Sequence, residues 1–316
     1  MHSANAPLVP RRARRSPALA ALLLASCAGV LAACTVSTAA AADAELPPVA
    51  DHGKMERHPG KLVWADLVTA DRAAAERFYG GLLGWTFRPL TVGHSRYDVA
   101  ELDGVPVAGL IEPRSTRTRL QPRWIAFLSV ADVAQAQRAA REHGGRVLGG
   151  PHRYARRGEQ VLLADPQGAS FVALQASGGD PQDTDTAVGD WIWCSLITSD
   201  PQAAASFYRA VFGYESYDAP GDDGSQHLLL ATDDYARASI NLAHRASGRL
   251  HPHWLAFVRV ADVRAASMKA ETLGARVLVQ PHPDRHGGEI AVIADPTGAP
   301  LGLMTEPSPE SAEAKP

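Results

Sequence analysis

The sequence predicts an α+β protein with two tandem domains, each built from two βαβββ units. Three short motifs recur in the same order about 130 residues apart, and strand and helix periodicities alternate in the same way within each copy. The 316 residues suffice for two domains of ordinary size. A composition of 46% hydrophobic and 21% charged residues is typical of a soluble globular protein. The expected domains are residues 61–177 and 189–306, joined by a linker at residues 178–188.

The internal repeat rests on motifs spread over the whole length of each copy. The matches share their order and their spacing, with offsets of 129, 130 and 130 residues, so each copy reads as one domain. The matching pairs are Phe78-Tyr79 with Phe207-Tyr208, Trp124-Ile125-Ala126-Phe127 with Trp254-Leu255-Ala256-Phe257, and Asp165-Pro166-Gln167-Gly168-Ala169 with Asp295-Pro296-Thr297-Gly298-Ala299.

The first unit can be followed element by element. Residues 62–69 are predicted to form a strand, and Asp71 is placed to cap the helix that follows. Gly84 is a typical helix end. Three strands are expected after it, around residue 86, over 97–101 and over 105–111. The apolar positions that predict the helix are Ala75, Phe78, Tyr79, Leu82 and Leu83.

The second unit repeats this order. A strand at residues 124–130 leads to a helix that opens at Asp132 and ends at Gly144-Gly145. Strands are expected near residue 147, over 160–164 and over 170–174. The second copy follows suit, with Asp200 as a helix cap and Pro201 at the first helical position, where its missing N–H costs nothing.

The N-terminus carries a targeting signal. Four arginines between Arg11 and Arg15 precede an uncharged apolar run over residues 18–33, which is shorter than the roughly 20 residues needed to span a bilayer. The run ends in Leu-Ala-Ala-Cys, which resembles a bacterial lipobox and predicts lipidation of Cys34, with Cys27 as the alternative. We therefore expect a signal peptide (1–33), a flexible tether (34–60), a disordered tail (307–316), and a lipid-anchored protein of the bacterial cell envelope that faces the periplasm or the exterior.

Other features exclude several classes of function. The formal charge of −3 gives no general attraction to nucleic acid, and no phosphate-binding glycine loop or nucleophile elbow is present. Cys194 is the one cysteine within the two domains, so no disulfide can form inside them. It lies in an apolar strand-like run, where a lone cysteine is more often a small buried residue than a nucleophile.

The motifs together resemble the vicinal oxygen chelate superfamily, which includes glyoxalase I and the bleomycin-resistance proteins. The resemblance covers residues 61–304 and is closest to glyoxalase-related tandem proteins. It implies that the two units of a domain curl mixed sheets around a concave cavity, where metal-dependent members hold a divalent ion. The motifs that carry it are Asp-x-x-x-Ala-x-x-Phe-Tyr-x-x-x-x-Gly-Trp/Tyr, Trp-x-x-Phe-x-x-Val-x-Asp-Val and Asp-Pro-x-Gly-Ala.

The ligands that such an ion needs are missing at the positions that the resemblance implies. Indole, methyl and glycine groups cannot coordinate a divalent cation. We therefore expect no metal and no other cofactor, with a divalent metal as the alternative. The implied positions are Trp64 and Trp193 in the first strands, Gly109 and Asn241 at the ends of the first units, Val172 and Gly302 in the last strands, and residues 124–126 and 254–256 where the second units open.

Instead, an aromatic-lined cavity with a few polar groups is expected in each domain. Alternation along a strand places Trp64 and Asp66 on one face, and Trp193 and Ser195 likewise. The tryptophans can equally fill the core, and Asp66 can equally make a structural hydrogen bond. The predicted ligand-binding residues are Trp64, Asp66, Tyr97 and Trp124 in the first domain, and Trp193, Ser195, His227, Asn241 and Trp254 in the second.

A second possible metal site lies in a loop of the second domain. His282, His286 and Glu289 are close in sequence, and His251 and His253 flank a proline. Prolines and glycines make this a loop, so the geometry of two histidines on one helix face cannot be assumed. The aligned stretch of the first domain lacks the second histidine.

The function expected from these features is metal-free binding of a small amphipathic or aromatic molecule by a membrane-anchored protein. The alternative is a glyoxalase-like lyase or a dioxygenase, with a metal held by His227 and Asn241 or with Asp66 as acid or base. A third possibility is an envelope interaction protein without a ligand. Two fused copies can satisfy internally the pairing of single-domain relatives, so a monomer is expected.

Overall fold

The computed structural model describes residues 45–50, 55–92, 95–112, 121–184, 186–219, 227–243, 251–284 and 288–306. The predicted signal peptide, Cys27, Cys34 and the predicted tail lie outside these residues. Within the described ranges, no helix has the length and apolar character needed to cross a membrane.

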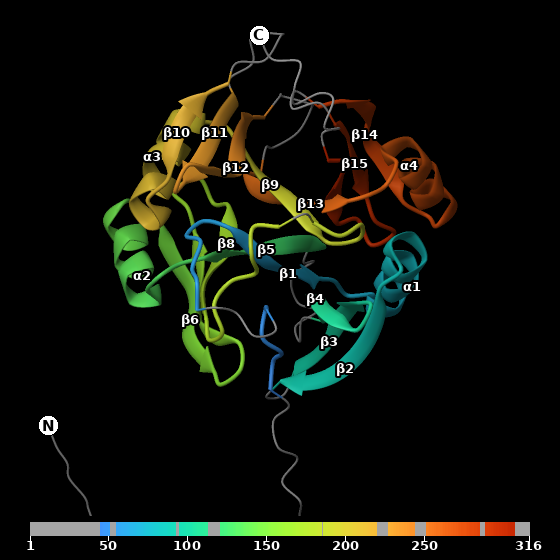
Figure 1. Cartoon of the computed structure of the whole chain (residues 1–316), viewed down its shortest axis with the longest axis horizontal. Helices are drawn as coiled ribbons and strands as arrows, with labels where there is room; N and C mark the ends of the chain where they lie inside the picture. Colours follow the sequence, from blue (N-terminus) through green and yellow to red (C-terminus); the bar gives the residue numbers. More distant parts are fainter. Residues whose placement is uncertain are drawn as a thin grey trace, which may run out of the picture. The chain divides into compact units, whose positions relative to one another are not determined.

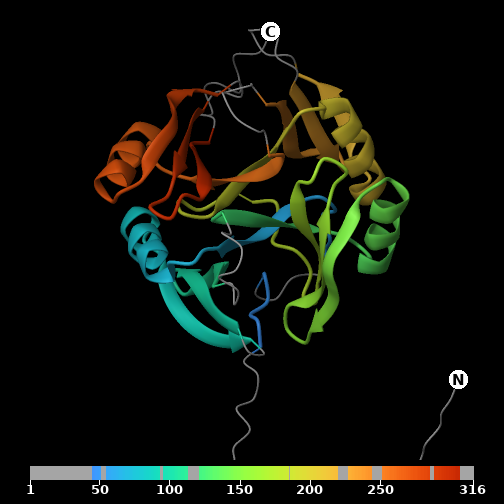
Figure 2. The ribbon, with the colours of Figure 1, turned by 180° about the vertical axis from the view of Figure 1, so that it is seen from behind.

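Each domain forms one curved eight-stranded sheet (Figure 1; Figure 2). The strand orders are β2-β3-β4-β1-β5-β8-β7-β6 and β10-β11-β12-β9-β13-β16-β15-β14. In the first sheet β1 runs parallel to β4 and antiparallel to β5, and in the second β9 runs parallel to β12 and antiparallel to β13. Two βαβββ units are thus joined through their first strands, which confirms the predicted α+β tandem fold.

The elements follow the predicted order, and their bounds are as follows. The first domain contains β1 (Leu62–Val68), α1 (Arg72–Leu83), β2 (Thr86–Val92), β3 (Ser95–Leu102), β4 (Val105–Ile111), β5 (Arg123–Ser129), α2 (Val133–Glu142), β6 (Arg146–Tyr154), β7 (Gly158–Ala164) and β8 (Ser170–Ala176). The second contains β9 (Trp191–Thr198), α3 (Pro201–Phe212), β10 (Glu215–Asp218), β11 (His227–Thr232), β12 (Tyr235–Leu242), β13 (His253–Arg259), α4 (Val263–Thr272), β14 (Arg276–Pro283), β15 (Glu289–Ala294) and β16 (Pro300–Met304).

Each of the four helices among the described residues has an aspartate as its N-cap. The Asp71 carboxylate accepts from the Ala74 N–H at 2.9 Å, and Asp132, Asp200 and Asp262 cap α2, α3 and α4 in the same way. These carboxylates satisfy an N–H that the first turn of a helix leaves unpaired. Gly84 and Gly213 end α1 and α3 in the left-handed conformation, which confirms the predicted end at Gly84. The second helix has His143 as its C-cap, one residue before the predicted Gly144.

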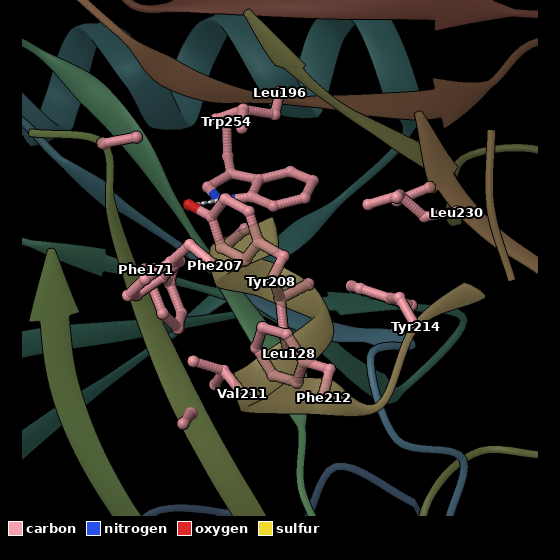
Figure 3. Close-up of a cluster of buried hydrophobic side chains, with 14 of the residues drawn as sticks. Leu128, Phe171, Leu196, Phe207, Tyr208, Val211, Phe212, Tyr214, Leu230 and Trp254 are labelled. Carbon is pink, nitrogen blue, oxygen red and sulfur yellow. Dashed lines mark hydrogen bonds between the residues drawn. The ribbon is translucent and has the colours of Figure 1, made fainter. Parts of the chain in front are cut away.

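The two domains share two hydrophobic cores. One combines β5, β8 and α2 of the first domain with β9, α3, β11 and β12 of the second, and the other combines β1, α1 and β4 with β13, α4, β15 and β16. Figure 3 shows part of the first core, in which Phe171 from β8 lies beside the α3 side chains Tyr208 and Phe212, with ring centroids 5.5 and 5.7 Å away. Neither domain therefore buries its helix-covered face without the other.

The repeated motifs meet across the boundary between the domains. Tyr79 of α1 donates its hydroxyl hydrogen to Asp295 Oδ2 of the second domain at 2.9 Å and accepts from Trp124 Nε1 at 2.9 Å. The motifs recognised as a family signature thus act together as a hydrogen-bonded bridge inside a shared core. The second copy of the bridge joins Tyr208 to Asp165 Oδ2 at 3.1 Å and to Trp254 Nε1 at 3.0 Å.

The residues before the first strand are packed against the fold, which corrects the prediction of a flexible tether for the described part of residues 34–60. Leu46 and Val49 are buried, with 5% and 8% of their surface exposed. The carbonyl oxygen of Gly60 accepts from the Tyr214 hydroxyl at 2.6 Å. The prediction failed because a short stretch rich in proline and alanine shows no periodicity, and its two apolar side chains find partners only in the folded sheet.

The linker between the domains is held by an ionic cluster, here called the linker clamp (His58, Lys61, Asp183 and Arg237). Asp183 accepts from Arg237 Nη1 at 2.7 and 2.8 Å and from Lys61 Nζ at 2.9 Å, and its oxygen lies 3.5 Å from His58 Nδ1. Burial by itself would raise the pKa of Asp183, but the hydrogen bonds and charges of Arg237 and Lys61 outweigh it and hold that pKa below its usual range. The clamp therefore fixes the linker to both domains at once.

Candidate functional site

Strand alternation divides the predicted site residues between the two faces of each sheet. Trp64 packs with Val63, Tyr97 and Phe127 on the concave face. Trp124 and Trp254 instead belong to the shared cores on the helix-covered face, where each donates its indole N–H to a tyrosine (Figure 3 shows Trp254). Their predicted role as stacking surfaces in a cavity is therefore corrected. Strand pairing places Ile125 and Leu255 on the concave face, and alternation then turns the neighbouring tryptophans to the opposite face.

A buried polar network occupies the concave face of the first domain. Asp66 Oδ1 accepts from Trp64 Nε1 at 2.8 Å and from the Tyr97 hydroxyl at 2.7 Å. Arg157, in the turn between β6 and β7, places its guanidinium carbon 3.8 Å from the centre of the Trp64 ring. The structure thus brings together three of the residues predicted for this domain and adds Arg157.

The electrostatics of this network follow from its burial. Burial raises the pKa of Asp66 above its usual range, although the Arg157 charge and the hydrogen bonds from Tyr97 and Trp64 oppose the shift. Burial and the neighbouring Asp66 carboxylate raise the pKa of Tyr97 well above its usual value. The tyrosine is therefore a stable hydrogen-bond donor to Asp66 at neutral pH.

Gly109 makes this contact possible. A β-carbon added at residue 109 would lie 2.0 Å from the Tyr97 hydroxyl oxygen and 2.2 Å from Asp66 Oδ1. Strand register pairs Asp66 with Gly109, and in the second domain it pairs Ser195 with Ser239. Gly109 is therefore equivalent to Ser239, which corrects its alignment with Asn241 by two residues. The turns before β4 and β12 have the same length, so it is the pairing of these strands with β1 and β9 that fixes the alignment.

The concave face of the second domain has a different polar network. The Ser195 and Ser239 hydroxyl oxygens are 2.7 Å apart, and Trp193 Nε1 donates to Ser239 at 3.2 Å. His227 Nδ1 contacts Asn241 Oδ1, and these residues are paired across β11 and β12 just as Tyr97 is paired with Ile111. Tyr97 and His227 are therefore equivalent positions in the two copies, whereas the polar groups on the two concave faces differ.

A cavity of about 860 Å³, here called the central cavity, is lined by residues of both domains and of the linker. Trp193 and Leu229 contribute apolar surface to it, and the linker clamp contributes charge. Its volume falls within the range of about 300 to 1,000 Å³ that is usual for small-molecule sites. Trp64 and Trp193 are the predicted residues that line it. The other lining residues are 49–50, 61–63, 105–107, 181–184, 186–187, 190–192, 234–237, Asp284, Met304 and Glu306.

The residues at the implied metal positions do not fit a divalent ion. A β-carbon at Gly302 would lie 2.1 Å from the Phe257 ring, so no longer side chain fits there, and Gly109 is equally closed. The concave-face residues of β5 and β13 at these positions are Ile125 and Leu255, which have no ligand atoms. Among the described residues, no group of three His, Cys, Asp or Glu side chains is placed to hold a metal ion.

The second possible metal site is not assembled among the described residues, and its predicted loop setting is wrong for two of them, since His282 lies in β14 and Glu289 in β15. His282 Nδ1 contacts the Pro283 carbonyl oxygen at 3.0 Å, whereas Glu289 accepts from Arg264 at 2.8 Å. His286 lies outside the described residues. Cys194 is fully buried, and burial raises the pKa of its thiol, so this thiol is not an activated nucleophile.

Sequence reasoning missed Arg157 and the linker clamp. Arg157 stands in the stretch Tyr-Ala-Arg-Arg-Gly-Glu, which has the composition of a solvent-exposed hairpin turn. Lys61, Asp183 and Arg237 are isolated charges in three separate segments. No local signal marks residues that are brought together only by the pairing of the domains.

Comparison with known proteins agrees with this architecture. A family model described as "Glyoxalase-like domain" matches residues 63–174 and again residues 191–304. "Putative glyoxylase CFP32" of Mycobacterium tuberculosis (strain CDC 1551 / Oshkosh) is 28% identical over 267 residues, covering 81% of this chain and 98% of that protein. The "Anthracycline biosynthesis protein DnrV" of Streptomyces peucetius is 27% identical over 263 residues, covering 78% and 93%.

Solved structures share the fold. The Mn(II)-bound glyoxalase from Novosphingobium aromaticivorans superposes with a TM-score of 0.56 at 15% identity, covering 79% of this chain and 83% of that one. The 2,2',3-trihydroxybiphenyl 1,2-dioxygenase from Sphingomonas wittichii strain RW1 gives 0.57 at 15% identity, covering 78% and 91%. These neighbours are glyoxalases and dioxygenases of the vicinal oxygen chelate fold, and the chain itself belongs to the glyoxalase-like domain family, of which it carries two tandem copies.

Proposed function

We propose that this protein binds a small amphipathic or aromatic molecule in the central cavity without a metal ion. The observation that carries the proposal is the chemistry of the cavity wall. The Trp193 ring and Leu229 offer an apolar surface, while Arg237 and Asp183 of the linker clamp offer charge on the same cavity. Such a wall suits a ligand with a flat or apolar body and a polar end.

The metal-free part of the proposal is supported by the misfit at the implied metal positions. Gly109 and Gly302 have no space for a longer side chain, and Trp64 and Trp193 stand where the first-strand ligands would be. The enzyme alternative with Asp66 as acid or base gains no support from the geometry. Asp66 is 6% exposed, receives two hydrogen bonds and does not line the central cavity.

Binding is tested with the dialysed protein against a panel of aromatic and amphipathic small molecules, by thermal shift followed by calorimetric titration. We expect a ligand whose affinity is unchanged by EDTA and falls about tenfold, on the order of 1.4 kcal/mol, in Trp193→Ala. Tyr217→Ala is the matched control, because Tyr217 is an exposed aromatic residue outside the cavity. Absence of any shift across the panel contradicts the proposal. Stoichiometric Ni, Zn, Fe or Mn in protein purified from metal-supplemented medium would favour the enzyme alternative.

We further propose that the protein is a lipid-anchored monomer of the bacterial cell envelope. The anchor rests on the basic and apolar N-terminal sequence, and the shared cores support a monomer because each domain already has its partner. We expect Cys34→Ser to abolish metabolic labelling with a fatty acid and to move the protein into the soluble fraction. Cys27→Ser serves as the control and should leave both unchanged. Labelling that follows Cys27 would reverse the assignment, and no labelling of the parent chain would refute the anchor.

A further inference from the structure

The concave face of the first domain is covered by the chain's own N-terminal segment (residues 45–50). Leu46 and Val49 pack into the apolar cluster that includes Val63 and Trp64. Between them, the carbonyl oxygen of Pro47 accepts a hydrogen bond from Arg157 Nε at 2.6 Å. The segment therefore combines apolar side chains with one oxygen placed on a buried cation, as a small amphipathic ligand would.

The N-terminal segment does not satisfy all the hydrogen-bonding groups of the concave face that it covers. Arg157 is 1% exposed, and within the described ranges its Nη2 has no hydrogen-bond partner. Leaving a buried guanidinium hydrogen unpaired is unfavourable, so the site is built for more than a single carbonyl oxygen.

The geometry of the guanidinium identifies the missing group. Nε and Nη2 lie on the same edge of arginine, and a carboxylate engages these two atoms side by side with its two oxygens. The Pro47 carbonyl has only one oxygen and satisfies Nε alone. The stacking of Arg157 on Trp64 holds this edge in a fixed orientation. The nearby carboxyl group of Asp66 already accepts hydrogen bonds from the Trp64 indole and the Tyr97 hydroxyl.

We infer that the N-terminal segment is an internal competitor at a second binding site, and that the site takes a small carboxylate with an apolar or aromatic body. When the segment leaves, the carboxylate pairs with Arg157 Nε and Nη2, and the body fills the space vacated by Leu46 and Val49. The site adjoins the central cavity, whose wall also includes Val49 and Trp64, but its polar anchor is Arg157, which does not line that cavity.

The test uses 1-naphthoate as probe and 1-naphthamide as its neutral counterpart. Leu46→Asn/Val49→Asn places two uncharged polar side chains on the apolar face and should release the segment without adding a carboxylate that could itself bind Arg157. All variants carry Trp193→Ala, so that binding in the central cavity contributes little. We expect calorimetric affinity for 1-naphthoate to rise at least tenfold on release of the segment, and the added Arg157→Lys, which keeps the charge but loses the paired donors, to remove the gain.

Hydrogen exchange of residues 45–50 shows whether the segment has been released. Release without a gain in 1-naphthoate affinity overturns the inference, and so does an equal gain for 1-naphthamide or a gain that survives Arg157→Lys. If the double asparagine variant does not fold, Leu46→Ser/Val49→Ser is used with the same criteria. Failure of the central cavity to bind any ligand leaves this result unaffected, because the readout depends on Arg157 and not on Trp193.

Discussion

Trp254→Ala is expected to lower the free energy of unfolding by about 3 to 5 kcal/mol, the usual range for removing a large aromatic side chain from a core. The Trp254 side chain is 3% exposed and lies at the centre of a core shared by both domains. Its ring contacts Tyr208 edge to face with centroids 5.1 Å apart, and its indole N–H is bonded to the Tyr208 hydroxyl. Chemical denaturation followed by circular dichroism measures the loss.

Trp193→Ala is the matched control for this substitution. Trp193 lies on the concave face, is partly exposed and lines the central cavity. We expect it to cost less than half as much stability as Trp254→Ala while weakening ligand binding. A smaller stability loss for Trp254 than for Trp193 would contradict the assignment of the two indoles to opposite faces.

Asp183→Ala is expected to destabilise the protein by about 3 to 5 kcal/mol near neutral pH, because it leaves a buried positive charge without its partner. The partner is Arg237, whose side chain is almost fully buried and whose Nη1 donates to both oxygens of Asp183. The loss is measured as the difference in unfolding free energy between parent and variant. Glu271→Ala is the control, since Glu271 is exposed on α4 and its loss should cost less than about 0.5 kcal/mol.

The cost of Asp183→Ala should depend on pH in one direction. The pKa of Asp183 is lowered in the folded protein, so its contribution is fully present above the unfolded value of about 3.9 and is lost as pH falls through the folded value. The difference between parent and variant is therefore constant between about pH 5 and 7 and shrinks below about pH 4. A difference that grows on acidification would show that Asp183 is not held by cations.

The sequence predicts the order of elements well because each depends on local chemistry. The aspartate caps, the helix-ending glycines and the strand periodicity are short-range signals. Each of them occurs in both copies of the internal repeat, which strengthens the prediction. The face assignment of Trp64 and Asp66 also follows from alternation along one strand. These are the parts of the candidate site that could be predicted.

The remaining parts depend on contacts between distant segments. In β5 and β13 both faces are buried, so Trp-Ile-Ala-Phe shows no alternation that would separate Trp124 from the concave face. The sequence around Arg157 predicts a surface residue, because it does not show that the N-terminal segment packs over this side chain. The alignment of Gly109 with Ser239 requires the pairing register, which a two-residue slip in the sequence alignment conceals.

The shared cores also constrain how the two copies can diverge in evolution. A substitution on a helix-covered face changes the packing of both domains, because each core contains β-strands and helices from both halves of the chain. The concave faces are not joined by a shared core, although Trp64 and Trp193 line the same cavity. Their polar networks differ, with Asp66 and Tyr97 in one and the Ser195–Ser239 pair in the other. The two copies can therefore change their concave chemistry separately, while the back of each remains tied to its partner.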